Sequence, residues 1–411
     1  MRFYGFFRIF ARNNSGNTYL RNFSQMMITR SIETEIQNEL GKGKAIVILG
    51  ARQVGKTTLL KEMFKEREQI LFLNGDESDV RAMLEHPTST ALKAIIGDKK
   101  TLIIDEAQRI TDIGLKLKII IDNIPYVQVI ATGSSSFELA NKINEPLTGR
   151  KWEHKMFPLS FTELVRNNGL LEEKRMLRHR LVYGGYPDVV MNEGQEKKIL
   201  KELSEDYLYK DILAFDKIQK SDKLVKLLQA LALQTGSQVS YNELGQICGL
   251  SSGTVESYID ILEKCYIVFR LGSFSRNLRN ELKSSRKIYF YDNGIRNAII
   301  ANFNPVDLRN DIGALWENYI VSERIKANSY NGRFCNSWFW RTAQQQEVDY
   351  LEEEDGKLSA FEFKYNPKRA ARAPLTFTKA YPEAGFKVIT PDNVEDFLLC
   401  DDALVKVDTE G

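Results

Sequence analysis

Residues 45–60 read AIVILGARQVGKTTLL, an apolar run followed by two glycines, a lysine and two threonines. Positions 50–57 match the pattern G-x-x-x-x-G-K-[ST], and the apolar run before it and the helical period after it are the context that this pattern requires. Glycines let backbone N–H groups curl around phosphates, while Lys56 reaches the β and γ phosphates and Thr57 can ligate Mg²⁺. The stretch therefore predicts a nucleotide-binding loop made of Gly50, Ala51, Arg52, Gln53, Val54, Gly55, Lys56, Thr57 and Thr58.

A second motif, TLIIDEAQ at residues 101–108, has two acids directly after four apolar residues. Ligands of parallel sheets bind at the carboxyl ends of the strands, which is where this motif places Asp105 and Glu106. Asp105 is predicted to hold the Mg²⁺ shell and Glu106 to polarise the attacking water. Another apolar run, residues 70–73, lies between the two motifs, as in the additional-strand class of NTPases. The alternative is a pair of plain strand-end charges, but beside a phosphate loop the pattern favours ATP hydrolysis.

Two further predictions concern sensing of the γ-phosphate. The strand in VQVIATGSSS, residues 127–136, ends in the candidate sensors Thr132, Ser134 and Ser135, of which Ser134 is the first choice. An ordinary polar loop is the alternative. Arg150, in LTGRKWEH, is a candidate arginine finger acting in cis or on a neighbouring subunit, and a surface arginine is the alternative.

Length and composition describe a chain of several domains. The 411 residues are 43% hydrophobic and 27% charged, which fits two or three folded domains. No apolar run is long enough to span a membrane, so no membrane association is predicted. Cys248, Cys265, Cys335 and Cys400 have no metal-ligand spacing and suit the reducing cytoplasm. Residues 1–27 are rich in arginine and lack acids, so they are predicted to be a transit-like leader or a disordered, non-native extension.

The periodicity divides the chain into three parts. Apolar runs at 45–49, 70–73, 101–104 and 127–131, with a weaker one at 152–157, predict a parallel sheet covered by helices. Helical pattern dominates from about residue 171 to 262, and a further α/β unit with a helix near 315–327 and three strands follows residue 310. The last 101 residues carry 12 Lys and Arg against 18 Asp and Glu, so attraction for nucleic acid must come from residues 1–310.

The helical part contains a helix-turn-helix pattern followed by a hairpin. Ser240 begins the first predicted helix, in which Leu244 and Ile247 point inward. The second helix, near 252–264, is acidic, which disfavours contact with phosphates. The following wing, residues 270–287, is basic, and it predicts either non-specific DNA contact or a structural or protein-docking role.

The C-terminal part contains the stretch QQEVDYLEEEDGKLSAFEFKYN, residues 345–366. Glu362 and Lys364 share one face of a strand, and the EEDGK turn brings Asp349 of the preceding strand beside Glu362. Glu317 lies on the helix just upstream. Carboxylates that fix Mg²⁺ and a cation that stabilises developing phosphate charge are what phosphodiester cleavage needs. The alternative is a surface strand with unrelated charges.

From about Ile28 onward, the chain resembles a family of bacterial and archaeal AAA-type ATPases. The resemblance rests on the motifs ILGARQVGKTTLL, LIIDEAQRI, ATGSSS, LTGR, FPLSFTEL, YGGYPDVV, KIYFYDNGIRNAI, ALWENYIV and FWRTAQQQEVDY followed by AFEFK, in this order. The resemblance implies a catalytic ATP site at Lys56, Thr57, Asp105 and Glu106. It also implies a C-terminal domain similar to the restriction-endonuclease fold, in which Glu317, Asp349, Glu362 and Lys364 form a nuclease-type site. No sensor asparagine is present, since Ser134 or Ser135 stands there.

The expected fold is α/β, with a P-loop AAA-type ATPase domain at residues 28–165 and a helical lid or linker at 166–222. A winged helix-turn-helix at 223–310 and a restriction-endonuclease-like domain at 311–411 complete it. One functional hypothesis couples ATP hydrolysis to Mg²⁺-dependent cleavage or handling of nucleic acid. The alternatives are an ATP-driven protein-docking switch with a silent nuclease-like domain, and nucleic-acid binding without cleavage. ATP sites of this type often lie between subunits, so a homo-oligomer is also expected.

Overall fold

The computed structural model describes residues 27–86, 88–134, 143–213, 221–275, 285–342, 344–369 and 371–399, of which the side chains of 206–213 and 221 are left aside. The leader proposed for residues 1–27 therefore lies almost wholly outside the described residues. Within them, no helix combines the length and the apolar character needed to cross a membrane.

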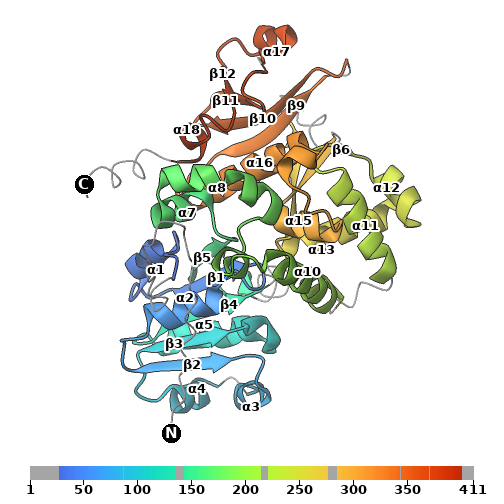
Figure 1. The fold of residues 1–411 in the computed structure, drawn as a ribbon. Coiled ribbons are helices and arrows are strands. Elements are labelled where there is room, and N and C mark those ends of the chain that lie inside the picture. Colours follow the sequence, from blue (N-terminus) through green and yellow to red (C-terminus); the bar gives the residue numbers. More distant parts are fainter. Residues whose placement is uncertain are drawn as a thin grey trace, which may run out of the picture.

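The nucleotide-loop motif belongs to a parallel five-stranded sheet (Figure 1, blue to green). The strand order is β2-β3-β4-β1-β5, so β4 lies in space between the loop strand β1 and the acid-bearing strand β3. All six residues of β1 are buried, as expected for a strand covered on both faces. The strands are β1 (Ala45–Gly50), β2 (Ile70–Asn74), β3 (Thr101–Asp105), β4 (Gln128–Gly133) and β5 (Lys151–Met156). Their helices are α1 (Glu33–Glu39), α2 (Lys56–Met63), α3 (Ser78–Met83), α4 (Ser89–Ile96), η1 (Ala107–Arg109) and α5 (Ile113–Asn123).

The middle of the chain is helical, as the periodicity predicts. Its helices are α7 (Phe161–Asn168), α8 (Leu170–Tyr183), α9 (Pro187–Met191), α10 (Glu196–Leu213), α11 (Ser221–Leu233), α12 (Tyr241–Cys248), α13 (Ser252–Lys264) and α15 (Asn293–Ile299). Side chains of Ser240 and Ser251 cap α12 and α13, and the antiparallel strands β7 (Val268–Ser273) and β8 (Arg286–Phe290) follow. Leu244 is buried as expected, but Ile247 is 54% exposed, because α12 turns that side chain away from the core.

A second sheet joins the middle and the C-terminal parts. Its order is β12-β11-β10-β9-β7-β8-β6, and the parallel pairing of β7 with β9 makes the hairpin continuous with the C-terminal strands. Strands from both sides of residue 310, where a domain boundary was expected, therefore belong to one sheet. The remaining strands are β6 (Gln238–Val239), β9 (Asn336–Arg341), β10 (Glu347–Glu354), β11 (Lys357–Phe363) and β12 (Gly385–Ile389). The remaining helices are η2 (Val306–Leu308), α16 (Ile312–Tyr330), α17 (Leu375–Ala380) and α18 (Glu395–Leu398).

The turn between β10 and β11 has the geometry that its sequence demands. Glu354 pairs with Lys357, so the loop contains only Asp355 and Gly356, whose φ angles are 51° and 77°. Two positive φ angles define the hairpin turn that matches strand twist, and Asp-Gly is a preferred pair for it. This register, in which Tyr350 faces Phe361, places Asp349 opposite Glu362 one step further along.

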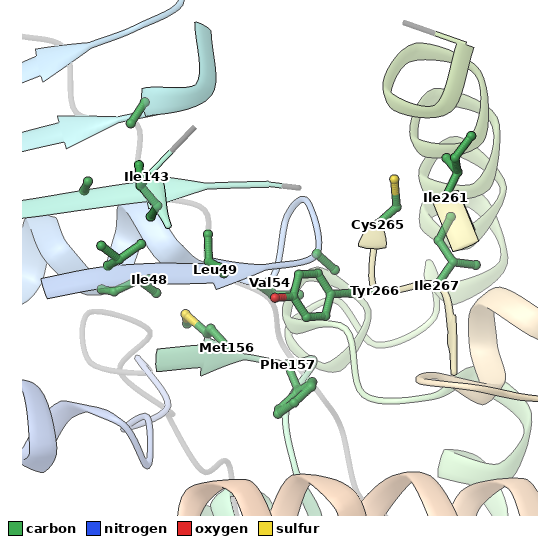
Figure 2. Packing of buried hydrophobic residues seen from close by; sticks show 14 of the residues in the cluster. Ile48, Leu49, Val54, Ile143, Met156, Phe157, Ile261, Cys265, Tyr266 and Ile267 are labelled. Carbon is green, nitrogen blue, oxygen red and sulfur yellow. The ribbon is translucent and has the colours of Figure 1, made fainter. Parts of the chain in front are cut away.

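The nucleotide-loop sheet meets the middle and C-terminal parts of the chain at Phe157, the first residue after β5. Its ring centroid lies 6.4 Å from that of Tyr266, 5.4 Å from that of Tyr291 and 5.7 Å from that of Tyr330. Figure 2 shows Tyr266 reaching from the segment after α13 toward Phe157 and Val54 of the nucleotide loop. Because one buried cluster runs from β1 to α13 and β8, the sheet of the nucleotide loop shares its core with the helical part.

Candidate functional site

The nucleotide loop is shaped by two glycines that no other residue could replace without movement. A Cβ at Gly50 would lie 2.0 Å from the carbonyl oxygen of Met156, so β1 and β5 approach closely only because a side chain is missing. Gly55, which caps α2, has a φ of 96°, in the left-handed region that side chains disfavour. The loop therefore turns sharply from β1 into the N-terminus of an eight-residue helix, where anions bind.

Lys56 is 4% exposed, and its ammonium donates to the carbonyl oxygens of Gly50 at 2.9 Å and Ala51 at 2.8 Å. These contacts fold the side chain back over the loop rather than out to solvent. A single buried positive charge is thus held at the centre of the turn, where it attracts phosphate.

The acid at the end of β3 is bonded to two hydroxyls. Thr57 Oγ1 donates to Asp105 Oδ2 at 2.7 Å, and Thr132 Oγ1, from β4, donates to Asp105 Oδ1. The carboxylate and the Thr57 hydroxyl are hard oxygen ligands of the kind Mg²⁺ prefers, so these two residues fit the expected ion. The hydroxyl of Thr132, one of the candidate phosphate sensors, is thus engaged by Asp105 in this structure.

Glu106 adopts a φ of 49°, which lifts its side chain out of the strand direction. Its Oε2 accepts from Gln108 Nε2 at 2.5 Å and from Ser134 Oγ at 3.3 Å, and Gln108 also donates to Ser134 at 3.0 Å. Ser134 therefore lies beside the Glu106 carboxylate, while Ser135 falls outside the described residues. Sequence reasoning missed Gln108, although its place three residues after Asp105 in TLIIDEAQ was a usable signal.

Of these side chains, Lys56, Thr57 and Glu106 line one pocket of about 510 Å³. The loop residues 52–58 and Glu106 line its phosphate end, whereas the other end is lined mainly by apolar groups. That second end consists of Met27, Ile28, Leu159, Pro187, Asp188 and Met191. Arg30 also lines the pocket.

Arg150 lies far from this pocket along the sheet. It directly precedes β5, whose first residue pairs with Ala45, whereas the loop follows the opposite end of β1. Its Nε is 2.8 Å from Asp122 Oδ1. An arginine finger acting in cis is therefore excluded by the direction of the strands.

The predicted C-terminal residues gather around a cavity of about 850 Å³ at one end of α16. Glu317, Asp349 and Lys364 line it, and Glu362 lies beside it, with Oε1 2.6 Å from Lys364 Nζ. Asp349 accepts from the Phe363 N–H at 2.8 Å. These four side chains, from α16, β10 and the end of β11, thus lie close together.

A further residue, Lys287 of β8, enters the same cluster. Its side chain is 2% exposed, and its Nζ lies 2.9 Å from Glu317 Oε1 and 2.5 Å from Glu347 Oε1. Tyr289, on the same face of β8, donates to Glu317 at 2.7 Å. Burial alone would lower the pKa of Lys287, but the surrounding carboxylates outweigh it and raise the pKa. The Lys287 ammonium, which is buried in the cluster, is thus the counter-charge for Glu317 and Glu347.

The cluster does not fit a divalent metal as it is arranged. In the described part of the chain, no group of three His, Cys, Asp or Glu residues is placed to hold a metal ion. Glu317 is engaged by Lys287 and Tyr289, and Glu362 by Lys364. Burial and the negative charges of Glu317 and Glu362 raise the pKa of Asp349 well above its ordinary value. The expected joint metal site is therefore not formed.

The basic wing is less available to nucleic acid than its sequence suggests. Arg270 is paired with Asp260 and Glu263 of α13, and Arg286 Nη1 lies 3.6 Å from Glu256 Oε1. These two described arginines are therefore paired with acids of α13, and the packing of β7 against α13 contributes to this pairing. The other cations predicted there, Arg276, Arg279 and Lys283, lie outside the described residues.

Three family models match successive parts of the chain. Residues 42–165 match the family model described as "AAA domain". Residues 174–306 and 312–403 match two models described as domains of unknown function, DUF8612 and DUF4143. Residues 42–165 are thus similar to AAA domains, and this match supports an ATP-binding, AAA-type ATPase.

Curated relatives span most of the chain at low identity. A protein of Mycobacterium tuberculosis is 24% identical over 363 residues, covering 86% of this chain and 78% of the relative. A protein of Methanocaldococcus jannaschii is 22% identical over 405 residues, covering 89% of each chain. Both are described as uncharacterized. Among solved structures, a Walker-type ATPase of Pyrococcus abyssi is similar at a TM-score of 0.46 and 16% identity, covering 67% of this chain and 96% of that one.

Proposed function

We propose that this protein binds ATP together with Mg²⁺ and hydrolyses it to ADP and phosphate. The observation that carries the proposal is the convergence of Lys56, Thr57 and Glu106 on one pocket, with Asp105 hydrogen-bonded to Thr57 beneath it. Lys56 and Thr57 lie at the start of the helix that follows β1, and Asp105 and Glu106 lie at the carboxyl end of β3 in the same parallel sheet. Nucleotides bind at this edge of parallel sheets.

The residues have separate tasks in this proposal. Lys56 and the loop N–H groups bind the phosphate oxygens, and Thr57 and Asp105 hold Mg²⁺, which neutralises charge on the transferred group. Glu106 accepts a proton from the attacking water as its oxygen bonds to the γ phosphorus. The bond from that phosphorus to the bridging oxygen breaks, and ADP leaves. Gln108 and Ser134 orient the Glu106 carboxylate through their hydrogen bonds.

The apolar end of the pocket is where we place the base. Ile28, Leu159 and Met191 belong to one small hydrophobic cluster that extends the pocket away from the phosphate loop. A flat heterocycle gains free energy by covering such surface, whereas a triphosphate does not.

Phosphate release by the purified protein tests the proposal. We expect turnover in Mg²⁺, little ATP binding by Lys56→Ala, and ATP binding with a rate about 10²–10⁴-fold lower for Glu106→Gln. Lys61→Ala, on the exposed face of the same helix α2, is the matched control and should behave as wild type. Equal rates for Glu106→Gln and wild type would show that Glu106 takes no part in the reaction. ATP binding by wild type without any turnover would show that the protein binds ATP but does not hydrolyse it.

For the C-terminal part we propose a docking role, with the nuclease-like residues silent in this conformation. The contacts that support a silent nuclease-like site are those of Lys287, since its ammonium engages Glu317, one of the three carboxylates expected to hold a metal, as well as Glu347. The partner, whether another protein, DNA or a second copy of the chain, would then respond to the nucleotide state of the AAA domain.

Incubation of supercoiled and linear DNA with the protein and Mg²⁺ or Mn²⁺, with and without ATP, separates the alternatives. We expect no cleavage from protein that hydrolyses ATP. Cleavage that is lost in Lys364→Ala but kept in Lys357→Ala, an exposed lysine at the start of the same strand, would instead establish the nuclease.

A further inference from the structure

Arg30 lies outside the residues that match the AAA family model, in the segment that precedes α1. It is 5% exposed, and three of its nitrogens reach three different acceptors. Nη1 donates to the carbonyl oxygen of Val54 at 2.6 Å, and Nη2 donates to that of Phe157 at 2.6 Å. Nε donates to Glu163 Oε1 at 3.0 Å. One buried cation thus ties the nucleotide loop to the end of β5 and to α7.

The bond to Val54 sets the direction of a peptide inside the loop. A trans peptide is planar, with its C=O and its N–H on opposite sides. Since the Val54 oxygen points to Arg30, the N–H of the following residue, Gly55, points away from the guanidinium. Loops of this pattern bind phosphate through such N–H groups, so a flipped Val54–Gly55 peptide would present an oxygen to the phosphates instead. Gly55 has no side chain to resist that flip, because glycine adopts both signs of φ readily.

We propose that Arg30 is a positioning residue for nucleotide phosphate, holding the Val54–Gly55 peptide with its N–H directed into the loop. The inference rests on the proposed function, because it concerns how the same pocket binds the phosphates of ATP.

The geometry explains why the position takes arginine. The guanidinium is planar, and its separate nitrogens reach three acceptors at fixed angles, whereas a lysine ammonium reaches from a single point. Glu163 supplies the counter-charge, and it is held in turn by the N–H groups of Ser31 at 2.8 Å and Ser160 at 2.9 Å. The fold can therefore keep Arg30 buried and charged without drawing a negative charge from the pocket.

Kinetics with Arg30→Lys and Glu163→Gln test the proposal. Arg30→Lys keeps the positive charge but loses the geometry at Val54, and a lost charge-assisted hydrogen bond should raise KM for ATP about 10-fold or more. Because the phosphates are held in the ground state and the transition state alike, kcat should change by less than about 3-fold. Glu163→Gln removes the ion pair and keeps the Val54 contact, so it should lower thermal stability while KM stays within about 2-fold of wild type.

The other outcomes overturn the proposal. Unchanged KM in Arg30→Lys, or a KM that rises equally in both variants as stability falls, would show that Arg30 only supports the fold. If Arg30→Lys does not fold, Arg30→Ala is assayed with millimolar methylguanidine, which should restore KM. Failure of both variants to fold would also assign Arg30 to stability alone. If wild type does not turn over ATP, the proposed hydrolysis is refuted, and calorimetric binding of ADP to the same variants then decides the role of Arg30. If wild type binds neither ATP nor ADP, the proposed function and the proposed role of Arg30 are both refuted.

Discussion

The backbone N–H of Phe157 donates to the hydroxyl of Tyr330 at 3.0 Å, and their rings lie 5.7 Å apart. Phe157 also accepts from Arg30, which bonds the nucleotide loop. Tyr330 is the last residue of α16, and Glu317 lies 13 residues earlier in the same helix, about 20 Å away at 1.5 Å per residue. One helix therefore runs from the contact with Phe157 to Glu317 at the C-terminal cavity.

This junction predicts the effect of Tyr330→Phe. The substitution keeps the ring but leaves the buried N–H of Phe157 without this acceptor, which should lower the free energy of unfolding by about 1–3 kcal/mol. Tyr126→Phe, at a tyrosine that is 47% exposed, should change it little. Denaturant titration followed by tryptophan fluorescence measures the free energy of unfolding of both variants. Equal stability of the two would show that the hydrogen bond does not stabilise the junction.

Gly50→Ala tests the close approach of β1 and β5. Its new Cβ would meet the Met156 oxygen at 2.0 Å, so the strands must separate and the loop must shift. We expect a stability loss of about 1–3 kcal/mol and loss of ATP binding. Gly253→Ala in α13, where a Cβ meets nothing within 4 Å, should be neutral or slightly stabilising. Retained ATP affinity in Gly50→Ala, measured by calorimetry, would contradict this account of the loop.

Lys287→Met tests the internal counter-ion of the C-terminal cluster. Removing the buried ammonium leaves the half-buried Glu317 and Glu347 without their shared partner, which should lower the free energy of unfolding by about 1–3 kcal/mol. Adding Glu317→Gln should recover part of that loss, because the repulsion falls when one charge is removed. A double-mutant cycle by chemical denaturation measures the coupling, and additive effects would show that the two residues act independently.

Glu352 predicts a pH dependence of stability. It is 3% exposed, and burial alone would raise its pKa, but hydrogen bonds from Arg324 at 2.8 and 2.6 Å and from Asn328 at 2.7 Å outweigh burial and lower the pKa. A lowered pKa in the folded state gives stability that is complete above the unfolded value of about 4.5 and is lost as the pH falls through the folded value. Wild type should therefore exceed Glu352→Gln by about 3–5 kcal/mol at pH 7.

That difference should shrink steadily below about pH 4.5. Thermal unfolding of both proteins between pH 3 and 8 measures it. A difference that stays constant over this range would show that the charge of Glu352 contributes nothing and that only its shape matters.

The sequence by itself determined the features that depend on residues close together in the chain. The segment 50–57 could be recognised because strand, glycines and helix start lie within a few residues, and Asp105 follows directly from the apolar run before it. The Asp355–Gly356 turn predicted the pairing of β10 with β11, and hence Asp349 beside Glu362, because hairpin register is set by the loop.

Only the tertiary structure decided which distant charges meet. Arg30 and Glu163 are 133 positions apart, and Lys287 reaches Glu317 because α16 packs against β8. The same packing pairs the basic wing with the acidic helix α13 and puts Arg150 at the wrong end of β5 for a finger in cis. Charge patterns along a chain indicate how many charges there are, but burial and strand order decide which of them neutralise one another.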